Sequence, residues 1–309
     1  GTPHRVYVPD TLSNTVHVID PRTFRVVSRF AVDALPHHVT PSWDMTRLYV
    51  NNTVGNTLTE IDARTGRPTR TIPVHDPYNL YFTPDGKRAI VVAERERRLD
   101  FRHPKTWKLI ASVHVPWPGV DHLDFTADGR YLVASAEFSG VVVKVDVVRM
   151  RLVRHAVVGS LPIDVRLSAD GKVFYVADQG VHGVHVLDAG TLRKLSFIPT
   201  ARGAHGLCVS RDGKYLYVSN RLAGSIHVIA FATRKVVARW NVGGSPDMLQ
   251  VSPDGTQLWT ADRFSNTVTV VDARRGVVLK RITVGSQPHG LAYFPQPGRY
   301  SVGHNGVYR

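Results

Sequence analysis

The chain repeats one short pattern of apolar and polar positions along almost its whole length. Two apolar residues that flank one variable residue are followed by Ser or Thr, a further residue, Asp and Gly, as in LYFTPDG and LQVSPDG. Complete copies start at Leu80, Leu123, Val165, Leu207 and Leu249, and degraded copies start at Val39 and Leu291. Successive starts are 41, 43, 42, 42, 42 and 42 residues apart. A nearly constant period of this length indicates a repeat architecture.

Each copy predicts four short β-strands. The Asp-Gly pair predicts a tight turn between the first strand and an alternating strand such as RYLVASAE or QLWTAD. A loop, a further alternating strand such as NTVTVVD, a polar turn and a last strand such as KVVARWNV complete the copy. No helical periodicity competes with this pattern. Seven such units predict an all-β fold, a seven-bladed β-propeller of four-stranded antiparallel blades.

The two ends of the sequence share one unit. The N-terminus supplies three strands, HRVYVPD, NTVHVID and FRVVSRF, and the C-terminus supplies the missing inner strand at Leu291. We therefore expect residues 1–309 to form a single propeller whose ring is closed by N- and C-terminal strands sharing one blade. The tail at residues 298–309 has no place left in that blade. We expect it either to add an outer contact or to fold towards the channel mouth, bringing His304 and Asn305 near the site.

The second strands carry a recurring motif, which reads YVPD, YVNN, YVAD and YVSN at residues 7, 49, 175 and 217. With these motifs and this period, the chain resembles the YVTN-repeat β-propeller family of bacterial and archaeal exported or surface proteins. The resemblance implies the propeller fold and an extracytoplasmic location, secreted or at the cell surface, with a signal peptide absent from these residues. More distantly, the chain resembles haem d1-type propeller domains of nitrite reductases, and nitrous oxide reductase carries a copper cluster held by propeller histidines. Because propellers host many unrelated activities, function has to be argued from the site.

Composition adds a strong positive charge. The formal net charge is +14 at pH 7, which favours polyanionic partners such as nucleic acid, anionic lipid or a cell-wall polymer. Lys and Arg are scattered over all seven repeats, a distribution that is also typical of a basic, solvated surface. No stretch approaches about 18 uninterrupted apolar residues, so we expect no transmembrane segment. Cys208 is the single cysteine, which excludes an intrachain disulfide. Separately, we expect the protein to be a monomer.

Candidate site residues follow from propeller geometry. The inner strand of each blade starts at one end of the central channel, and the loop before it opens onto that mouth. These loops follow a P-x-G pattern, and where Gly is replaced a second side chain reaches the mouth. The x positions in ring order are His37, Tyr78, Asp121, Ile163, His205, Asp247 and His289, and the following positions are His38, Asn79, His122, Asp164, Gly206, Met248 and Gly290.

One arc of the mouth combines metal-ligating side chains. Because the ring closes, His205, Asp247, His289 and His37 occupy four adjacent blades. Three imidazoles and one carboxylate predict a first-row transition-metal site, with copper favoured and zinc or iron as alternatives. A solvated polar funnel without a metal is the competing interpretation of the same residues.

Four further residues are candidates for catalysis. Asp121 and His122 stand opposite the arc and could transfer protons. Arg221 and Arg263 follow the ends of second strands at the mouth, where they could orient an anionic substrate or pair with local acids. The second strands themselves end in Asp10, Asn52, Glu94, Glu137, Asp178, Asn220 and Asp262, which we expect to cap turns.

Two functions remain open at this point. The first is a channel-mouth metal- or cofactor-binding propeller, in the form of a copper-like redox enzyme that acts on a small, anionic substrate. The second is a non-enzymatic binding module or scaffold for a protein, a cell-wall polymer or another polyanion. Nucleic acid is the less expected partner, because the strands show no aromatic and basic stacking platform. No GxSxG, P-loop, CxxC or HExxH motif adds another reaction class.

Overall fold

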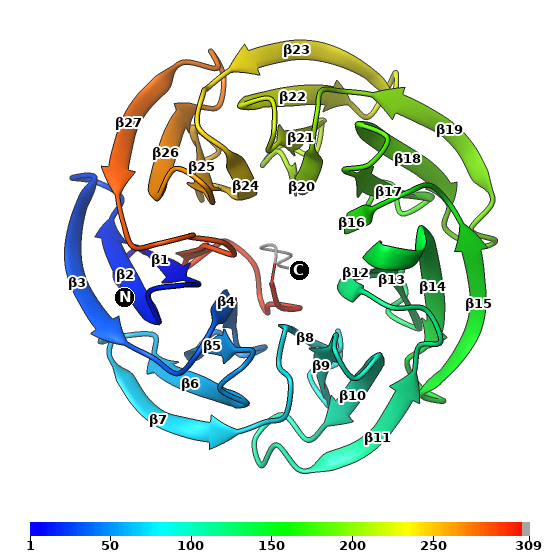
Figure 1. Cartoon of the computed structure of the whole chain (residues 1–309), viewed down its shortest axis with the longest axis horizontal. Coiled ribbons are helices and arrows are strands. Elements are labelled where there is room, and N and C mark those ends of the chain that lie inside the picture. The colour runs from blue at the N-terminus through cyan, green and yellow to red at the C-terminus, as the bar shows by residue number, and fades with distance from the viewer. Residues whose placement is uncertain (305–309) are drawn as a thin grey trace.

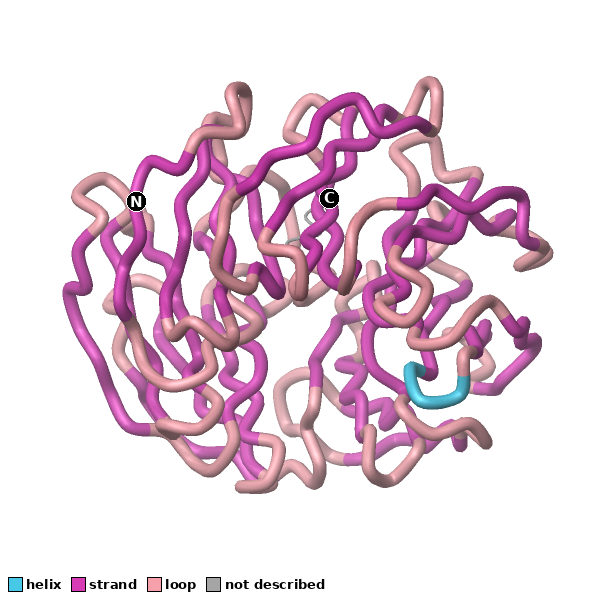
Figure 2. The backbone as a smooth tube through the Cα atoms, turned by 45° about the horizontal axis from the view of Figure 1, so that its top comes forward, coloured by secondary structure: helices cyan, strands magenta, loops and turns pink. Residues whose placement is uncertain are grey.

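The computed structural model of the protein describes residues 1–304 and arranges them as seven four-stranded sheets around one axis (Figure 1). All strand pairs within a sheet are antiparallel, which confirms the predicted blades. Figure 2 shows that strands and short loops account for nearly the whole chain, apart from one short 3-10 turn, η1 (Glu137–Ser139). Among the described residues, no helix is long and apolar enough to cross a membrane.

Each blade is given from the axis outward. The first blade contains Ala292–Phe294 (β28), Arg5–Asp10 (β1), Thr15–Asp20 (β2) and Arg25–Ala31 (β3). The second contains Pro36–Pro41 (β4), Arg47–Asn52 (β5), Thr57–Asp62 (β6) and Pro68–Pro73 (β7). The third contains Asn79–Phe82 (β8), Ala89–Ala93 (β9), Arg98–Arg102 (β10) and Leu109–His114 (β11). The fourth contains Val120–Phe125 (β12), Tyr131–Ala136 (β13), Val141–Asp146 (β14) and Arg151–Val157 (β15).

The remaining three blades follow the same order. The fifth contains Pro162–Leu167 (β16), Val173–Asp178 (β17), Gly183–Asp188 (β18) and Lys194–Pro199 (β19). The sixth contains Ala204–Val209 (β20), Tyr215–Asn220 (β21), Ser225–Ala230 (β22) and Lys235–Asn241 (β23). The seventh contains Pro246–Val251 (β24), Gln257–Asp262 (β25), Thr267–Asp272 (β26) and Val278–Thr283 (β27).

The repeated Asp-Gly motif is explained by the turn that it forms. In the third blade, Thr83 Oγ1 donates a hydrogen bond to Asp85 Oδ1 at 2.6 Å, and the same carboxylate oxygen accepts from the Lys87 backbone N–H at 3.0 Å. Gly86 then adopts φ 68°, a left-handed conformation that costs glycine little. The Asp-Gly motif therefore forms structural turns at the end of the channel opposite the mouth. It contributes no residue to the candidate site.

The hydrophobic core lies between blades. One cluster joins Tyr7 and Val18 of the first blade to Val39 and Leu48 of the second, with Phe294 of β28 packed among them. The inner three strands of each blade are largely buried, whereas an outer strand such as β3 is mostly exposed. Because each blade buries its faces against its neighbours, the ring is stable only when closed.

Closure takes place in the first blade, as the sequence predicts. The inner strand β28 pairs antiparallel with β1, with Tyr7 opposite Ala292 and Arg5 opposite Phe294. The loop before β28 also joins the two ends, since the Gly285 backbone N–H donates to Asp10 Oδ1 at 2.9 Å.

The C-terminal segment turns into the middle of the ring, where Figure 1 shows it in red. It runs antiparallel to the free inner edge of β8, with Gly303 bridged to Tyr81 and the Phe82 backbone N–H donating to Val302 O at 3.0 Å. Of the two alternatives for the tail, the structure thus shows the one directed at the channel, and it buries His304 there. Asn305 lies outside the described residues.

Candidate metal centre

The start of each inner strand places polar side chains at one end of the propeller axis, which we call the mouth. His37 and His38 come from β4, Asp121 and His122 from β12, and His205 from β20. Asp247 comes from β24, whereas Tyr78 and His289 lie in the loops just before β8 and β28. All of these side chains are at most 9 % exposed, so the mouth is lined by desolvated titratable groups.

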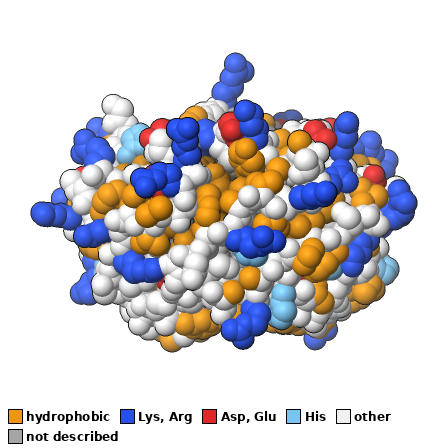
Figure 3. Space-filling view, turned by 90° about the horizontal axis from the view of Figure 1, so that it is seen from above, with side chains coloured by type: hydrophobic (Ala, Val, Ile, Leu, Met, Phe, Trp, Pro, Cys, Tyr) orange, Lys and Arg blue, Asp and Glu red, His pale blue; other side chains and the backbone are white. Residues whose placement is uncertain are grey.

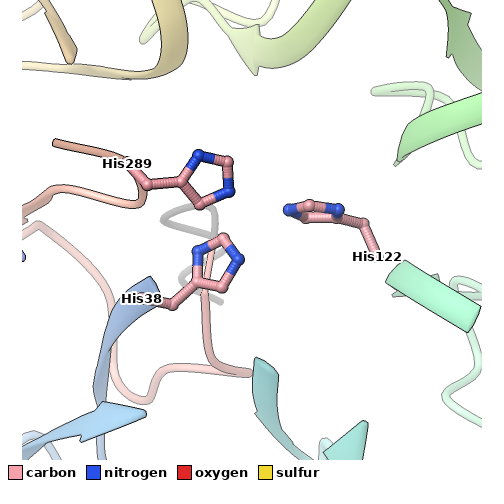
Figure 4. Close-up of side chains that lie close together, drawn as sticks. All are labelled: His38, His122 and His289. Atoms are coloured by element: carbon pink, nitrogen blue, oxygen red, sulfur yellow. The ribbon is translucent and has the colours of Figure 1, made fainter. Parts of the chain in front are cut away.

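Three imidazoles from three blades converge on the axis. His38, His122 and His289 each offer one ring nitrogen, and these three atoms lie within 4.8 Å of one another. Figure 4 shows His38 and His289 side by side, with His122 approaching from the opposite side of the ring. The His38 ring centre is 4.8 Å from that of His289 and 5.1 Å from that of His122. A histidine triad that could bind a metal is therefore present.

The triad contains buried nitrogen atoms without hydrogen-bond partners. Within the part of the chain that the structure describes, both ring nitrogens of His38 and the Nε2 atoms of His122 and His289 have no partner. An unpartnered buried polar group costs about 1–3 kcal/mol, and such groups are rare in folded proteins. A metal ion would satisfy one nitrogen of each ring, and imidazole is a ligand that Zn, Cu and Fe accept.

Carboxylates orient two of the three imidazoles. Asp247 Oδ2 lies 3.1 Å from His289 Nδ1, and Asp121 contacts His122 Nδ1. When Nδ1–H donates to the carboxylate, Nε2 is left free to bind a metal, as in carboxylate–histidine–metal arrangements. Arg263 Nη1 also lies 3.1 Å from His289 Nδ1, and donation by Arg263 would instead place the proton on Nε2. A metal ion at Nε2 would select the first tautomer.

Protonation states favour metal binding by His38 and His289. Burial lowers the pKa of His38 well below its usual value, and the neighbouring His304, His289 and His122 lower it further. Burial also lowers the pKa of His289, although Asp247 opposes the shift. Burial disfavours the charged form of His122 as well, but Asp121 outweighs it and the pKa of His122 is raised overall. Two of the three imidazoles are therefore neutral at pH 7, as metal ligands must be.

The predicted arc is assembled around its carboxylate. Asp247 Oδ1 lies 2.7 Å from His205 Nδ1, and its Oδ2 contacts His289, Arg221 at 3.2 Å and Arg263 at 3.8 Å. Burial opposes ionisation of Asp247, but His205, His289 and Arg221 together hold its pKa well below the usual range. Asp247 is thus an ionised hub at the mouth.

Only one member of that arc belongs to the histidine triad. His289 contributes a nitrogen to it, whereas His205 contacts Asp247 and His37 Nδ1 lies 3.2 Å from Thr53 Oγ1. His37 still stacks against the triad, with its ring centre 5.1 Å from that of His289. His38 was predicted at the mouth but not as a metal ligand. Its signal was the replacement of the P-x-G glycine, which allows a second side chain to point inward.

Arg221 and Arg263 pair with Asp247 at the mouth rather than with Asn220 and Asp262, the residues that end their own strands. Besides Asp247, Arg221 Nη2 donates to Gln179 Oε1 at 2.6 Å. Their side chains are only 13 % and 19 % exposed, so both arginines are largely buried at the mouth. By contrast, Asp178 caps the loop that follows it, accepting from the Gly180 and Val181 backbone N–H groups at 3.0 and 3.2 Å.

The opposite side of the mouth is acidic. Burial, with the negative charge of Asp121, raises the pKa of Glu137 to about 9 and that of Glu94 to about 8. Asp121 itself stays ionised, because His122 lowers its pKa against the effect of burial. Glu94 and Glu137 were expected only to cap turns. Their role at the mouth depends on burial, for which the sequence gives no signal.

Comparison with known proteins agrees with the fold. The sequence model of the YNCE-like beta-propeller matches residues 2–297. The chain belongs to the YNCE-like β-propeller family. No curated protein matches it.

Solved structures of several differently named proteins resemble this YNCE-like propeller. The periplasmic gluconolactonase PpgL of Pseudomonas aeruginosa is 22% identical, with a TM-score of 0.79 over 95% of this chain and 99% of the other. Kuenenia stuttgartiensis hydrazine synthase is 21% identical, with a TM-score of 0.72 over 82% and 87%. The dihydro-heme d1 dehydrogenase NirN, solved in complex with DHE, is 17% identical, with a TM-score of 0.71 over 94% and 75%. Likeness at this level shows the fold alone.

The hub at Asp247 makes a prediction about stability. We expect Asp247→Asn to lower the free energy of unfolding by about 3–5 kcal/mol, because two largely buried guanidinium groups lose their counter-charge. Urea unfolding at pH 7.5 measures the change. The control is Glu96→Gln, which breaks exposed pairs with His75 and Arg98 and should cost less than about 1 kcal/mol. Equal effects of the two substitutions would contradict the role of Asp247 as a charge hub.

Proposed function

We propose that the protein binds a first-row transition metal in its channel through His38, His122 and His289. The observation that carries the proposal is the convergence of three buried imidazoles, from three blades, each with at least one ring nitrogen that lacks a partner among the described residues. Divalent copper is favoured over zinc and iron, because it binds nitrogen donors most tightly in this series. Asp121 and Asp247 position the rings of His122 and His289 rather than binding the metal themselves.

We propose further that the mouth admits a small anionic substrate beside this centre. Arg221 and Arg263 share one carboxylate, Asp247, so their pairing leaves an excess of positive charge next to His289. A bidentate guanidinium contact suits a carboxylate or an oxyanion. His37 and His205 line the same side of the mouth and complete its polar wall.

Proton transfer is assigned to the acidic side of the mouth. Glu94 and Glu137 hold protons at neutral pH, since burial raises their pKa values to about 8 and about 9. General acids work best with a pKa near the working pH. Asp121 contacts the triad through His122 and so links these carboxyl groups to the metal ligands. A bound copper ion would supply one-electron redox chemistry at the triad.

The names of the similar solved structures do not indicate which reaction this protein catalyses. They include a gluconolactonase, a hydrazine synthase and a dehydrogenase, and each is at most 22% identical to this chain. Because one fold serves such different activities, the site residues have to support the function.

Metal titration tests the proposal. We expect the purified protein to bind one Cu²⁺ or Zn²⁺ ion per chain and to melt at a higher temperature when metal is added at pH 7.5. His38→Ala and His289→Ala should each weaken binding by about 100-fold or more. Replacing His227, which is buried in β22 away from the axis, should leave affinity unchanged. A melting temperature that neither metal moves would refute the proposal.

A binding module for polyanions is the second candidate, and the charge of +14 favours it. Figure 3 shows Lys and Arg distributed over the visible face with few acidic side chains between them. A protein that ignores metals but binds an anionic cell-wall polymer, with affinity falling steeply as salt rises, would support this function instead. The extracytoplasmic location and the monomeric state suggested by the sequence remain proposals under either function.

A further inference from the structure

The C-terminal segment carries a fourth imidazole to the metal centre. His304 is 1 % exposed, and its ring centre lies 4.0 Å from that of His38 and 5.9 Å from that of His122. Neither of its ring nitrogens makes a hydrogen bond of good geometry among the described residues, and the Val39 backbone makes only a weak contact with the ring. A neutral imidazole has one unprotonated nitrogen, and that atom of His304 can bind a metal. His304 packs against His38 but lies outside the group of three whose nitrogens are within 4.8 Å of one another, so its ring has to approach further to bind the same metal.

Specific contacts hold the segment in place. The Ser301 backbone N–H donates to Trp43 O at 3.0 Å, and the His304 backbone N–H donates to Leu80 O at 3.3 Å. Tyr300 stacks on Trp43 with ring centres 5.3 Å apart, and Val302 is 1 % exposed within a cluster that includes Tyr81. The segment is therefore docked by backbone pairing and by apolar burial.

Two glycines make room for the segment. Gly303 adopts φ 121°, and a Cβ atom there would lie 2.6 Å from Tyr81 Cα. At Gly290, a Cβ atom would overlap His38 Nδ1 and lie 2.9 Å from His304 Cε1. Gly290 is one of the P-x-G positions where glycine is kept. Its missing side chain is what allows His38 and His304 to pack together.

The direction of the segment decides the side from which His304 approaches. β8 starts at the mouth with Asn79, and the segment runs antiparallel to it. The chain therefore enters from the opposite end of the axis and advances towards the mouth, so that His304 lies on the far side of His38.

We propose that His304 is the fourth ligand of the metal centre and that the C-terminal segment 298–304 closes the far side of the site when metal binds. This inference rests on the proposed metal site and adds to it a ligand that is not fixed by a blade. Four-coordinate binding of nitrogen donors suits copper and zinc. With His304 in place, an exchangeable position can face only the mouth, where the proposed anionic substrate enters.

Metal spectra of variants in which His304 is substituted test the proposal directly. His304→Cys should add a thiolate-to-metal charge-transfer band to the Co²⁺ or Cu²⁺ spectrum, since a thiolate gives that band only when bonded to the metal. His304→Ala should weaken Zn²⁺ binding by about 100-fold, or about 2.7 kcal/mol at 1.36 kcal/mol per tenfold. It should also remove one nitrogen from the hyperfine pattern of Cu²⁺. Hydrogen exchange of residues 298–304 should slow on addition of Zn²⁺ in the parent protein but not in His304→Ala.

Two control variants distinguish a failure of the fourth-ligand proposal from a failure of the proposed metal site itself. A chain that ends at Pro297 keeps β28 but lacks the segment, and it should show the same affinity loss as His304→Ala. Tyr300→Ala weakens docking while keeping the imidazole, and should cost much less affinity. If His304→Cys gives no thiolate band and His304→Ala binds Zn²⁺ like the parent, while His38→Ala loses affinity, the fourth-ligand proposal is overturned and the triad stands. If the parent binds no metal, both proposals fail.

Discussion

A chain shortened to end at Gly290 is expected to lose cooperative unfolding altogether. The shortened chain lacks β28, the inner strand of the first blade, and leaves the axial edge of β1 without a partner. Leu291, Ala292 and Phe294 are at most 1 % exposed, and they pack between the first blade and its two neighbours. Without them the ring is open at two blade interfaces, and a closed ring is what allows each blade to bury both faces.

Far-UV circular dichroism and urea titration measure this effect. We expect a broad, non-cooperative transition for the chain that ends at Gly290. The matched control ends at Pro297, retains β28 with all its pairings to β1, and should unfold in one cooperative step. A sharp transition for the shorter chain would show that six complete blades and an open first blade suffice, which contradicts the closure argument.

Acid is expected to destabilise the metal-free protein strongly. Burial lowers the pKa of His37, His38 and His304 well below the usual value and that of His205 to about 3. In the unfolded chain these imidazoles regain a pKa of about 6.5, so the unfolded state takes up protons that the folded state excludes. Their contribution to stability is complete above about pH 6.5 and is lost as the pH falls towards the folded-state values. His122, Glu94 and Glu137 act in the opposite direction, because their pKa values are raised in the folded state.

The expected size of the effect follows from linkage. Each fully excluded proton costs about 1.4 kcal/mol per pH unit below the unfolded pKa. Four histidines each lower the free energy of unfolding and the two glutamates offset part of the loss, so we expect a net fall of roughly 3 kcal/mol between pH 7 and pH 5. Urea unfolding in the presence of a chelator, at half-unit pH intervals, measures the slope.

One substitution isolates the contribution of a single ring. His37→Phe keeps an aromatic ring against Tyr78 and should reduce the slope by about 1.4 kcal/mol per pH unit. His114→Gln is the control, since His114 is exposed on β11 and lies away from the channel. A stability that stays constant from pH 7 to pH 5 would mean that the channel imidazoles accept protons in the folded state, contrary to their burial.

The sequence by itself determined the architecture. The seven-fold period, the Asp-Gly turns and the alternating strands are local signals, and each depends on residues that are neighbours in the chain. The missing inner strand at the N-terminus and the extra one at Leu291 then predicted closure, because an open propeller leaves a sheet edge unpaired. The P-x-G register likewise placed His37, Asp121, His205, Asp247 and His289 at one mouth, since every inner strand starts at the same end.

Only the tertiary structure decided which of those groups meet. His38 and His122 stand in blades that are not adjacent, and their approach to His289 depends on the width of the ring and on side-chain directions. Asp247 contacts two guanidinium groups and two imidazoles because four loops converge on it. The C-terminal segment follows no repeat, so the sequence does not predict where it binds. Only the tertiary structure shows that it pairs with the free inner edge of β8. Burial sets the pKa values of the channel groups, and burial is a property of the closed ring rather than of any one repeat.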